Sequence, residues 1–220
     1  MGVVVARRAE KATRRGISPL LLLILLVAVV SVGGVVGWNF LGSNLVATRA
    51  AQDELVALKA ALEQPPVDDT VARPADHEAA WVLRIPRLGI ETPVIAGVDE
   101  SDLRRGVGWY PGTALPGEVG NFALAGYRFS NGEPFRRLLD LHVGDEVIVD
   151  TAQATFTYTM ISAPSDLTVQ ADDSWVLNPV PGSPDQVPTQ SLLTLTTAED
   201  VIDTPDRSVG FGTLTRTETR

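Results

Sequence analysis

The chain has no cysteine among its 220 residues and only two histidines. Without cysteine it can form no disulfide bond, no thiolate nucleophile and no acylated cysteine anchor of the kind that lipoproteins carry. Basic residues are also few, because 18 Lys and Arg stand against 27 Asp and Glu and leave a net charge of −9. An acidic protein repels phosphates, so no nucleic acid partner is expected. The 45% apolar content allows one domain with a core and flanking segments.

The N-terminal region contains one long apolar run. No charged residue occurs in residues 16–48, and residues 17–36 are almost all Leu, Val, Ile, Ala and Gly. This length matches the roughly 20 residues that a helix needs to cross a bilayer, and exceeds the apolar core of a cleaved signal peptide. The basic tail 1–16 is expected to stay in the cytoplasm. We therefore predict a retained single-pass anchor at 17–37, with the rest of the chain outside the cell membrane.

Residues 38–80 are predicted to form a helical stalk and then a linker rich in Pro, Asp and Ala. Three leucines at helical spacing give the helix an apolar face: Leu55, Leu58 and Leu62. This stripe is expected either to extend a dimer outside the membrane or to cover part of the following domain. Within the anchor, Gly33 and Gly37 have the small-xxx-small spacing that permits close helix packing, so a homodimer through this face is a further prediction.

From Trp81 onward, short alternating or apolar runs are separated by Gly and Pro turns. Seven of these runs are predicted to be strands: 81–85, 93–96, 122–125, 146–150, 155–162, 192–196 and 208–214. Short helices are expected near 101–105 and 133–141. This pattern predicts a mainly β fold, a closed or nearly closed barrel over 81–216, followed by a short tail at 217–220.

Two of these strands end in unusual residues. Residues 192–197 read Leu-Leu-Thr-Leu-Thr-Thr and are followed by Ala198, and residues 121–128 read Asn-Phe-Ala-Leu-Ala-Gly-Tyr-Arg. Both segments resemble the catalytic strands of the sortase family, within it the class E-like proteins of high-GC Gram-positive bacteria. Further segments carry the same resemblance in the same order: 83–90, 110–113, 133–138, 143–147 and 175–179.

The resemblance implies an eight-stranded barrel with a groove for a sorting-signal peptide. In the family, a Cys thiolate attacks the carbonyl between Thr and Gly of a Leu-Pro-x-Thr-Gly-like motif, a His protonates the leaving amine, and an Arg steadies the oxyanion. The Cys position here holds Ala198, whose methyl does no covalent chemistry. The His position holds Tyr127, and a phenol is a far weaker acid than imidazolium. Only Arg207, nine positions after Ala198, is retained.

Three residues beside these positions are expected to line the peptide groove: Thr197, Arg128 and Asn131. We predict a catalytically inactive pseudosortase that binds or scaffolds sorting-signal peptides or surface and pilin-like proteins. One alternative is an enzyme with altered chemistry that uses Thr197 or Tyr127, and another is a structural spacer with a vestigial groove. An engineered Cys→Ala change would account for Ala198 and leave Tyr127 unexplained, so natural replacement is favoured.

The remaining candidates for chemistry are two histidines and several acid pairs. His77 falls in the predicted linker and His142 precedes a turn, so neither is expected to be a base. Acid pairs raise the hypothesis of a calcium site: Asp172-Asp173, Glu199-Asp200, and Asp203 with Asp206. None has the spacing of an EF-hand, so no metal or cofactor is predicted. Glu199 and Asp200 are expected near Arg207, where they would neutralise its charge.

Overall fold

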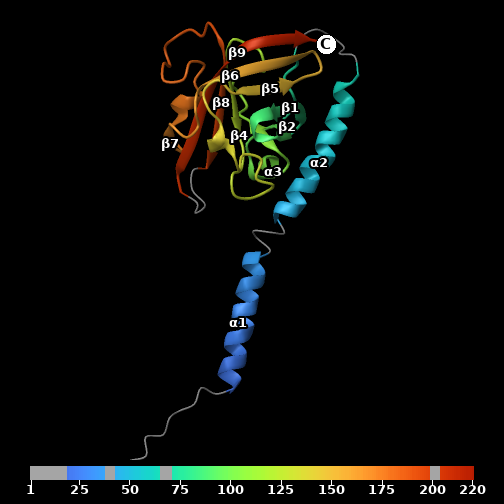
Figure 1. Ribbon diagram of the computed structural model, residues 1–220, viewed down its shortest axis with the longest axis vertical. Coiled ribbons are helices and arrows are strands. Elements are labelled where there is room, and N and C mark those ends of the chain that lie inside the picture. The colour runs from blue at the N-terminus through green and yellow to red at the C-terminus, as the bar shows by residue number, and fades with distance from the viewer. Residues whose placement is uncertain (1–18, 38–42, 65–70, 199–203) are drawn as a thin grey trace, which may run out of the picture. The chain divides into compact units, whose positions relative to one another are not determined.

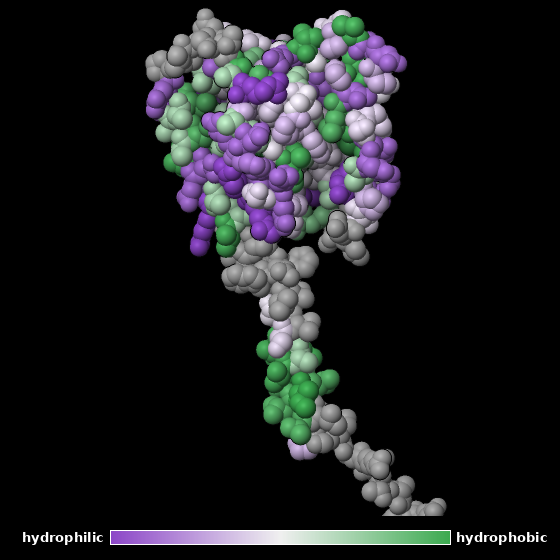
Figure 2. Space-filling view, turned by 180° about the vertical axis from the view of Figure 1, so that it is seen from behind, coloured by the Kyte–Doolittle hydropathy of each residue, from purple (hydrophilic) through white to green (hydrophobic). Residues whose placement is uncertain are grey.

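The computed structural model describes residues 19–37, 43–64, 71–198 and 204–220, and its ribbon is shown in Figure 1. The chain divides into two compact units, residues 1–39 and 40–220. In the first unit, helix α1 (Pro19–Gly37) contains no charged residue. Its described large side chains are exposed, and Figure 2 shows the hydrophobic surface that they form: Leu20, Leu23, Ile24, Leu25, Leu26, Val27, Val29 and Val30. No helix in the described ranges meets both the length and the hydropathy of a membrane span. The anchor at 17–37 and the dimer through Gly33 and Gly37 stay predictions.

The second unit contains a closed barrel of eight strands, as the sequence predicts. Its strands follow the order β6-β5-β1-β2-β3-β4-β8-β9, and β9 closes the ring by pairing with β6. Their bounds are β1 (Ala79–Ile85), β2 (Ile90–Ala96), β3 (Val107–Trp109), β4 (Gly120–Ala125), β5 (Glu146–Asp150), β6 (Ala154–Ser162), β8 (Ser191–Ala198) and β9 (Asp206–Thr219). A ninth strand, β7 (Thr168–Gln170), pairs with the first residues of β9.

The longer strands agree with the sequence prediction, and the two short ones were not predicted. β3 and β7 have three residues each, too few for an alternating pattern to stand out. β9 continues to Thr219, which pairs with Ala154 of β6, so the residues predicted as a C-terminal tail extend a barrel strand.

Aromatic side chains pack together with aliphatic ones in the barrel core. Trp81 lies edge-to-face against both Trp109 and Phe122, with ring centroids 5.5 Å apart in each pair. This is the geometry that aromatic pairs prefer, and large buried rings contribute much of a core's stabilisation. The Trp109 indole nitrogen donates to the carbonyl of Ala114 at 3.1 Å, so the buried polar group is satisfied.

Helix α2 (Ser43–Leu62) packs on the outside of the barrel. Leu58 and Leu62 are buried against Val82 of β1, and Leu55 is partly buried beside them. The helix end is held by Arg220, whose Nη1 donates to the carbonyl of Leu62 at 3.1 Å. Figure 1 shows α2 beside the barrel. The leucine stripe therefore has the second of its two predicted roles, covering part of the domain.

The two short helices predicted inside the domain have different outcomes. Helix α3 (Glu100–Leu103) forms near 101–105 as expected. The helix predicted at 133–141 is wrong, since only the 3₁₀ turn η3 (Leu138–Asp140) forms there. Asn131 and Glu133 have φ of 51° and 50°, in the left-handed region that a right-handed helix excludes. Further 3₁₀ turns are η2 (Pro86–Leu88) and η4 (Ser174–Leu177).

Candidate functional site

Strand register brings the ends of β4, β8 and β9 together. β4 and β8 are parallel, with Ala125 opposite Thr196, so the residues that follow β4 emerge beside the end of β8. β8 and β9 are antiparallel, and Ala198 is the direct partner of Arg207. The Cβ atoms of such partners are about 4.5–5.5 Å apart on the same face of the sheet. The Ala198 methyl group therefore lies beside the aliphatic stem of Arg207.

A cavity of about 320 Å³ lies at this junction. Its lining includes four of the six residues predicted for the site, which are Tyr127, Thr197, Ala198 and Arg207. The other lining residues are mostly apolar: Val98, Leu103, Tyr110, Ala125, Gly126, Ala171 and Thr196. The sequence-based assignment thus selected residues that are far apart along the chain and share one cavity in the fold.

Arg207 supplies the charge of this cavity. Its Nη1 donates to the backbone carbonyls of Thr204 at 2.7 Å and Asp206 at 2.9 Å, which fix the direction of the guanidinium. Among the described lining residues, it is the only one that carries a charge. Glu199 and Asp200, predicted to neutralise Arg207, lie outside the described residues, as does Asp203.

Tyr110 is a further residue of the site that sequence reasoning missed. Its side chain lines the cavity, and burial raises the pKa of its phenol while the positive charge of Arg207 lowers it. The phenol therefore stays neutral near pH 7 and can donate a hydrogen bond. One usable signal was present, because Tyr110 opens a Tyr-Pro-Gly-Thr segment that the family resemblance already included. Nothing in that segment indicated that the side chain would line the same cavity as Arg207.

Thr197 has a structural role in the described fold. Its hydroxyl donates to the carbonyl of Gly126 at 2.8 Å, and its side chain is buried. Gly126 in turn donates its backbone N–H to the carbonyl of Thr196 at 3.2 Å. These bonds continue the β4–β8 pairing past the end of β4. The hydroxyl is thus committed to a backbone carbonyl, and no His, Asp or Glu lies among the described lining residues to activate it.

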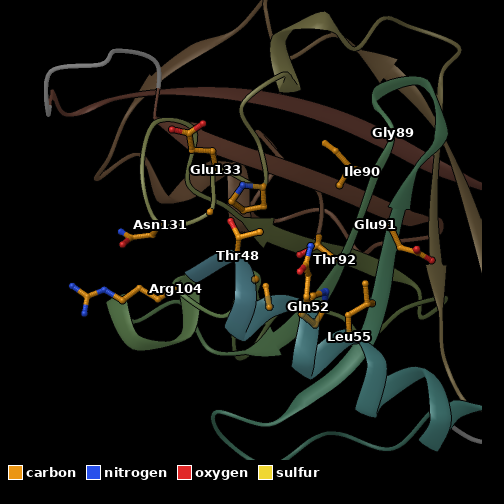
Figure 3. Close-up of a pocket in the computed structure, with 15 residues that line it drawn as sticks. Thr48, Gln52, Leu55, Gly89, Ile90, Glu91, Thr92, Arg104, Asn131 and Glu133 are labelled. Atoms are coloured by element: carbon orange, nitrogen blue, oxygen red, sulfur yellow. The ribbon is translucent and has the colours of Figure 1, made fainter. Parts of the chain in front are cut away.

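Two residues predicted for the groove do not line this cavity. Arg128 lies over the ring of Phe129, with Cζ 4.7 Å from the ring centroid. Asn131 lines a second cavity of about 230 Å³ between α2, β2 and the loop after Tyr127 (Figure 3). The reason is the turn at 131–133, whose left-handed residues direct the loop toward α2.

Helix α2 holds that loop at its first turn. The Asn44 side chain donates to Glu133 Oε1 at 2.8 Å and accepts from the backbone N–H of Gly132 at 3.2 Å. Thr48 and Gln52 of α2 face the second cavity from the opposite side (Figure 3). The start of α2 is therefore connected, through this loop, to the segment that begins at Tyr127.

His77 is attached to the barrel. Its Nδ1 lies 2.9 Å from Asp102 Oδ1, and Asp102 is buried, with 1% of its surface exposed. Within the described ranges, His77, Asp99 and Asp102 form the one group whose possible metal-ligand atoms cluster, all within 4.8 Å of one another. Asp102 belongs to α3, and its neighbour Leu103 lines the cavity at Ala198. The hydrogen bond between His77 and Asp102 thus helps to hold α3, which contributes Leu103 to the lining of that cavity.

The His77–Asp102 pair should make the stability of the fold depend on pH, which can be tested. The hydrogen bond to Asp102, and then its charge, raise the pKa of His77 above the ordinary 6.5. Because the folded pKa lies above the unfolded one, the stabilisation is fully present below the unfolded pKa and is lost as the pH rises through the folded pKa. The Asp102→Asn variant should titrate His77 at lower pH than the wild type. Imidazole proton shifts measure both midpoints by NMR, and equal midpoints would contradict the pairing.

Comparisons with known proteins agree with this geometry. A family model described as "Sortase domain" matches residues 83–215. Sortase E1 of Streptomyces coelicolor is 33% identical over 145 residues, which are 60% of this chain and 39% of that protein. The chain thus spans about two fifths of the length of this curated relative.

Solved structures give the same result. The sortase E structure from Streptomyces avermitilis aligns with a TM-score of 0.60 and 33% identity, over 66% of this chain and 93% of the other. Sortase E1 from Streptomyces coelicolor, solved with a tripeptide in the active site, aligns with a TM-score of 0.59 and 31% identity. That alignment covers 66% of this chain and 94% of the other.

Proposed function

Because the chain belongs to the sortase family, we propose that its barrel binds peptides and has lost transpeptidase activity. One observation carries the proposal: the cavity beside Ala198 is open and retains Arg207, while no thiol or imidazole lines it in the described part of the chain. The ligand we propose is a sorting-signal peptide, either free or as part of a surface or pilin-like protein.

The absence of turnover follows from the chemistry of the replaced positions. Acyl transfer needs a nucleophile that forms a covalent intermediate, and the methyl of Ala198 forms none. It also needs a proton donor to the leaving amine, and Tyr127 offers a phenol where an imidazolium would act. Thr197 does not substitute, because its hydroxyl is buried and bound to Gly126.

Binding is supported by the shape and lining of the cavity. Its volume of about 320 Å³ is at the lower end of the roughly 300–1,000 Å³ of small-ligand sites, and its walls combine apolar side chains with a few polar groups. Tyr127 lies in the lining, so the cavity is not closed by that larger side chain. A solved relative holds a tripeptide in its active site. An open, partly apolar cavity favours a binding module over a spacer with a vestigial groove.

We also propose that the module acts at the cell surface of a Gram-positive bacterium. The support is the apolar segment 17–37 after the basic tail 1–16, which would place the N-terminus in the cytoplasm and the barrel outside the membrane.

A steric block tests peptide binding at this cavity. Ala171 lines the cavity and is exposed, so Ala171→Trp should obstruct it without disturbing the core. We expect the full chain in detergent micelles to bind a fluorescent Leu-Ala-Ser-Thr-Gly peptide saturably by anisotropy. The variant should bind at least about tenfold more weakly, a loss of roughly 1.4 kcal/mol.

Ala50→Trp is the matched control, because Ala50 is an exposed residue of α2 that does not line the cavity. It should bind peptide as the wild type does. Equal affinities of wild type and Ala171→Trp would place the peptide elsewhere on the protein. No binding by the wild type at millimolar peptide would identify the groove as vestigial.

A further inference from the structure

We propose that the cavity beside Ala198 prefers peptides that end in a free carboxylate over uncleaved sorting signals. Such a peptide is the product of hydrolysis after the Thr of a sorting signal, so a reaction that cleaves the signal would supply this ligand. The inference rests on the proposed function, because it concerns peptide bound in the same cavity.

The charge of the lining is the first argument. Arg207 is the only charged side chain among the described lining residues, and the other walls are apolar or carry hydroxyl groups. A partly enclosed cation is stabilised most by an anion brought close to it, because the local dielectric is lower than that of water. An internal Thr-Gly amide is neutral, whereas a terminal Thr brings one negative charge.

The space beside the guanidinium is the second argument. Ala198 is the direct cross-strand partner of Arg207, and its side chain ends at the methyl group. The position next to the Arg207 stem thus has no anionic or nucleophilic group on the partner strand. A carboxylate placed over Ala198 would occupy that position. It would bind non-covalently, through hydrogen bonds and an ion pair with Arg207.

The available donors are the third argument. Both described hydrogen bonds of Arg207 run from Nη1 to backbone carbonyls, which orients the guanidinium, and within the described ranges its Nε and Nη2 donors are left for a ligand. A guanidinium binds a carboxylate through two parallel N–H donors, and such charge-assisted bonds are stronger than neutral ones. Tyr110 adds a phenol donor that burial keeps protonated. Arg207 and Tyr110, which line the same cavity, therefore both offer donors to an anion bound there.

Three peptides that differ only at the end test the preference. Isothermal titration of the full chain in detergent micelles should compare Leu-Ala-Ser-Thr as the free acid, the same peptide as its amide, and Leu-Ala-Ser-Thr-Gly amide. We expect the free acid to bind at least about tenfold more tightly than either neutral peptide, because only its carboxylate forms charge-assisted hydrogen bonds with Arg207.

Two variants assign the preference to Arg207. Arg207→Gln should bind all three peptides alike. Arg216→Gln, which changes an exposed arginine of the same strand that pairs with Glu146 and Glu218, should keep the wild-type preference. In Ala198→Asp, a carboxylate of the chain itself would lie beside Arg207, so this variant should also lose the preference for the free acid even if Arg207→Gln does not fold.

The outcomes separate this inference from the proposed function. Equal binding of the free acid and the neutral peptides by the wild type would overturn the carboxylate preference and leave the peptide-binding function intact. Retention of the preference in a folded Ala198→Asp variant would also overturn it. No binding of any of the three peptides would overturn both proposals.

Discussion

Restoring two side chains together is expected to restore peptide cleavage. The double variant Ala198→Cys, Tyr127→His should cleave Leu-Ala-Ser-Thr-Gly at least about a hundredfold faster than either single variant, since general acid catalysis contributes roughly 10²–10⁴-fold. Both positions line one cavity with Arg207, so the new thiol and the new imidazole would both contact the peptide bound there. Neither group alone completes the reaction, because the thiol needs a proton donor for the leaving amine and the imidazole needs a nucleophile.

Mass spectrometry of the peptide over time measures this effect. Alkylation by iodoacetamide in Ala198→Cys would show that the new thiol is accessible, and the double variant carrying Ser at position 198 is the matched control with a poorer nucleophile. Cleavage by the single Ala198→Cys variant at the rate of the double variant would contradict the role assigned to position 127.

Removing Trp109 is expected to have the largest effect on stability. The side chain is buried at the barrel centre against Trp81, and its nitrogen is bonded to Ala114. Trp→Ala changes in cores cost about 3–5 kcal/mol, a large part of a typical stability of about 5–15 kcal/mol. For a domain of this size, the corresponding fall in Tm is roughly 10 °C.

Thermal unfolding followed by circular dichroism compares Trp109→Ala with Trp175→Ala. Trp175 is half-buried and packs against Phe211 in a smaller cluster, so its removal should lower Tm by clearly less. Equal effects of the two changes would contradict the central position of Trp109. Because Tyr110 follows Trp109 directly, the folded fraction of Trp109→Ala should also bind peptide more weakly.

The sequence predicted the barrel because its longer strands alternate and end at Gly and Pro turns. It also predicted the grouping of Tyr127, Ala198 and Arg207, since the family resemblance fixes these positions relative to strand ends. The paired register of β4 with β8 and of β8 with β9 is the physical reason that the grouping holds.

Contacts that depend on the direction of a side chain could not be predicted from the sequence. Asn131 was placed in the groove by its nearness to Tyr127 along the chain, but left-handed residues turn its loop toward α2. His77 was placed in a linker, but Asp102 holds it on the barrel across 25 positions of sequence. Tyr110 was missed because only the fold brings its phenol near Arg207.

One measurement tests most directly whether this protein binds sorting signals without cleaving them. In it, the full chain with ¹³C-labelled alanine methyl groups is titrated in micelles with Leu-Ala-Ser-Thr-Gly, and the signals of the peptide are followed for hours in the same tube. Ala198→Gly identifies the methyl signal of interest. The account predicts a saturable shift of the Ala198 signal while the peptide stays intact. Steady accumulation of a Thr-terminated fragment in the wild type, absent from Arg207→Ala, would contradict it.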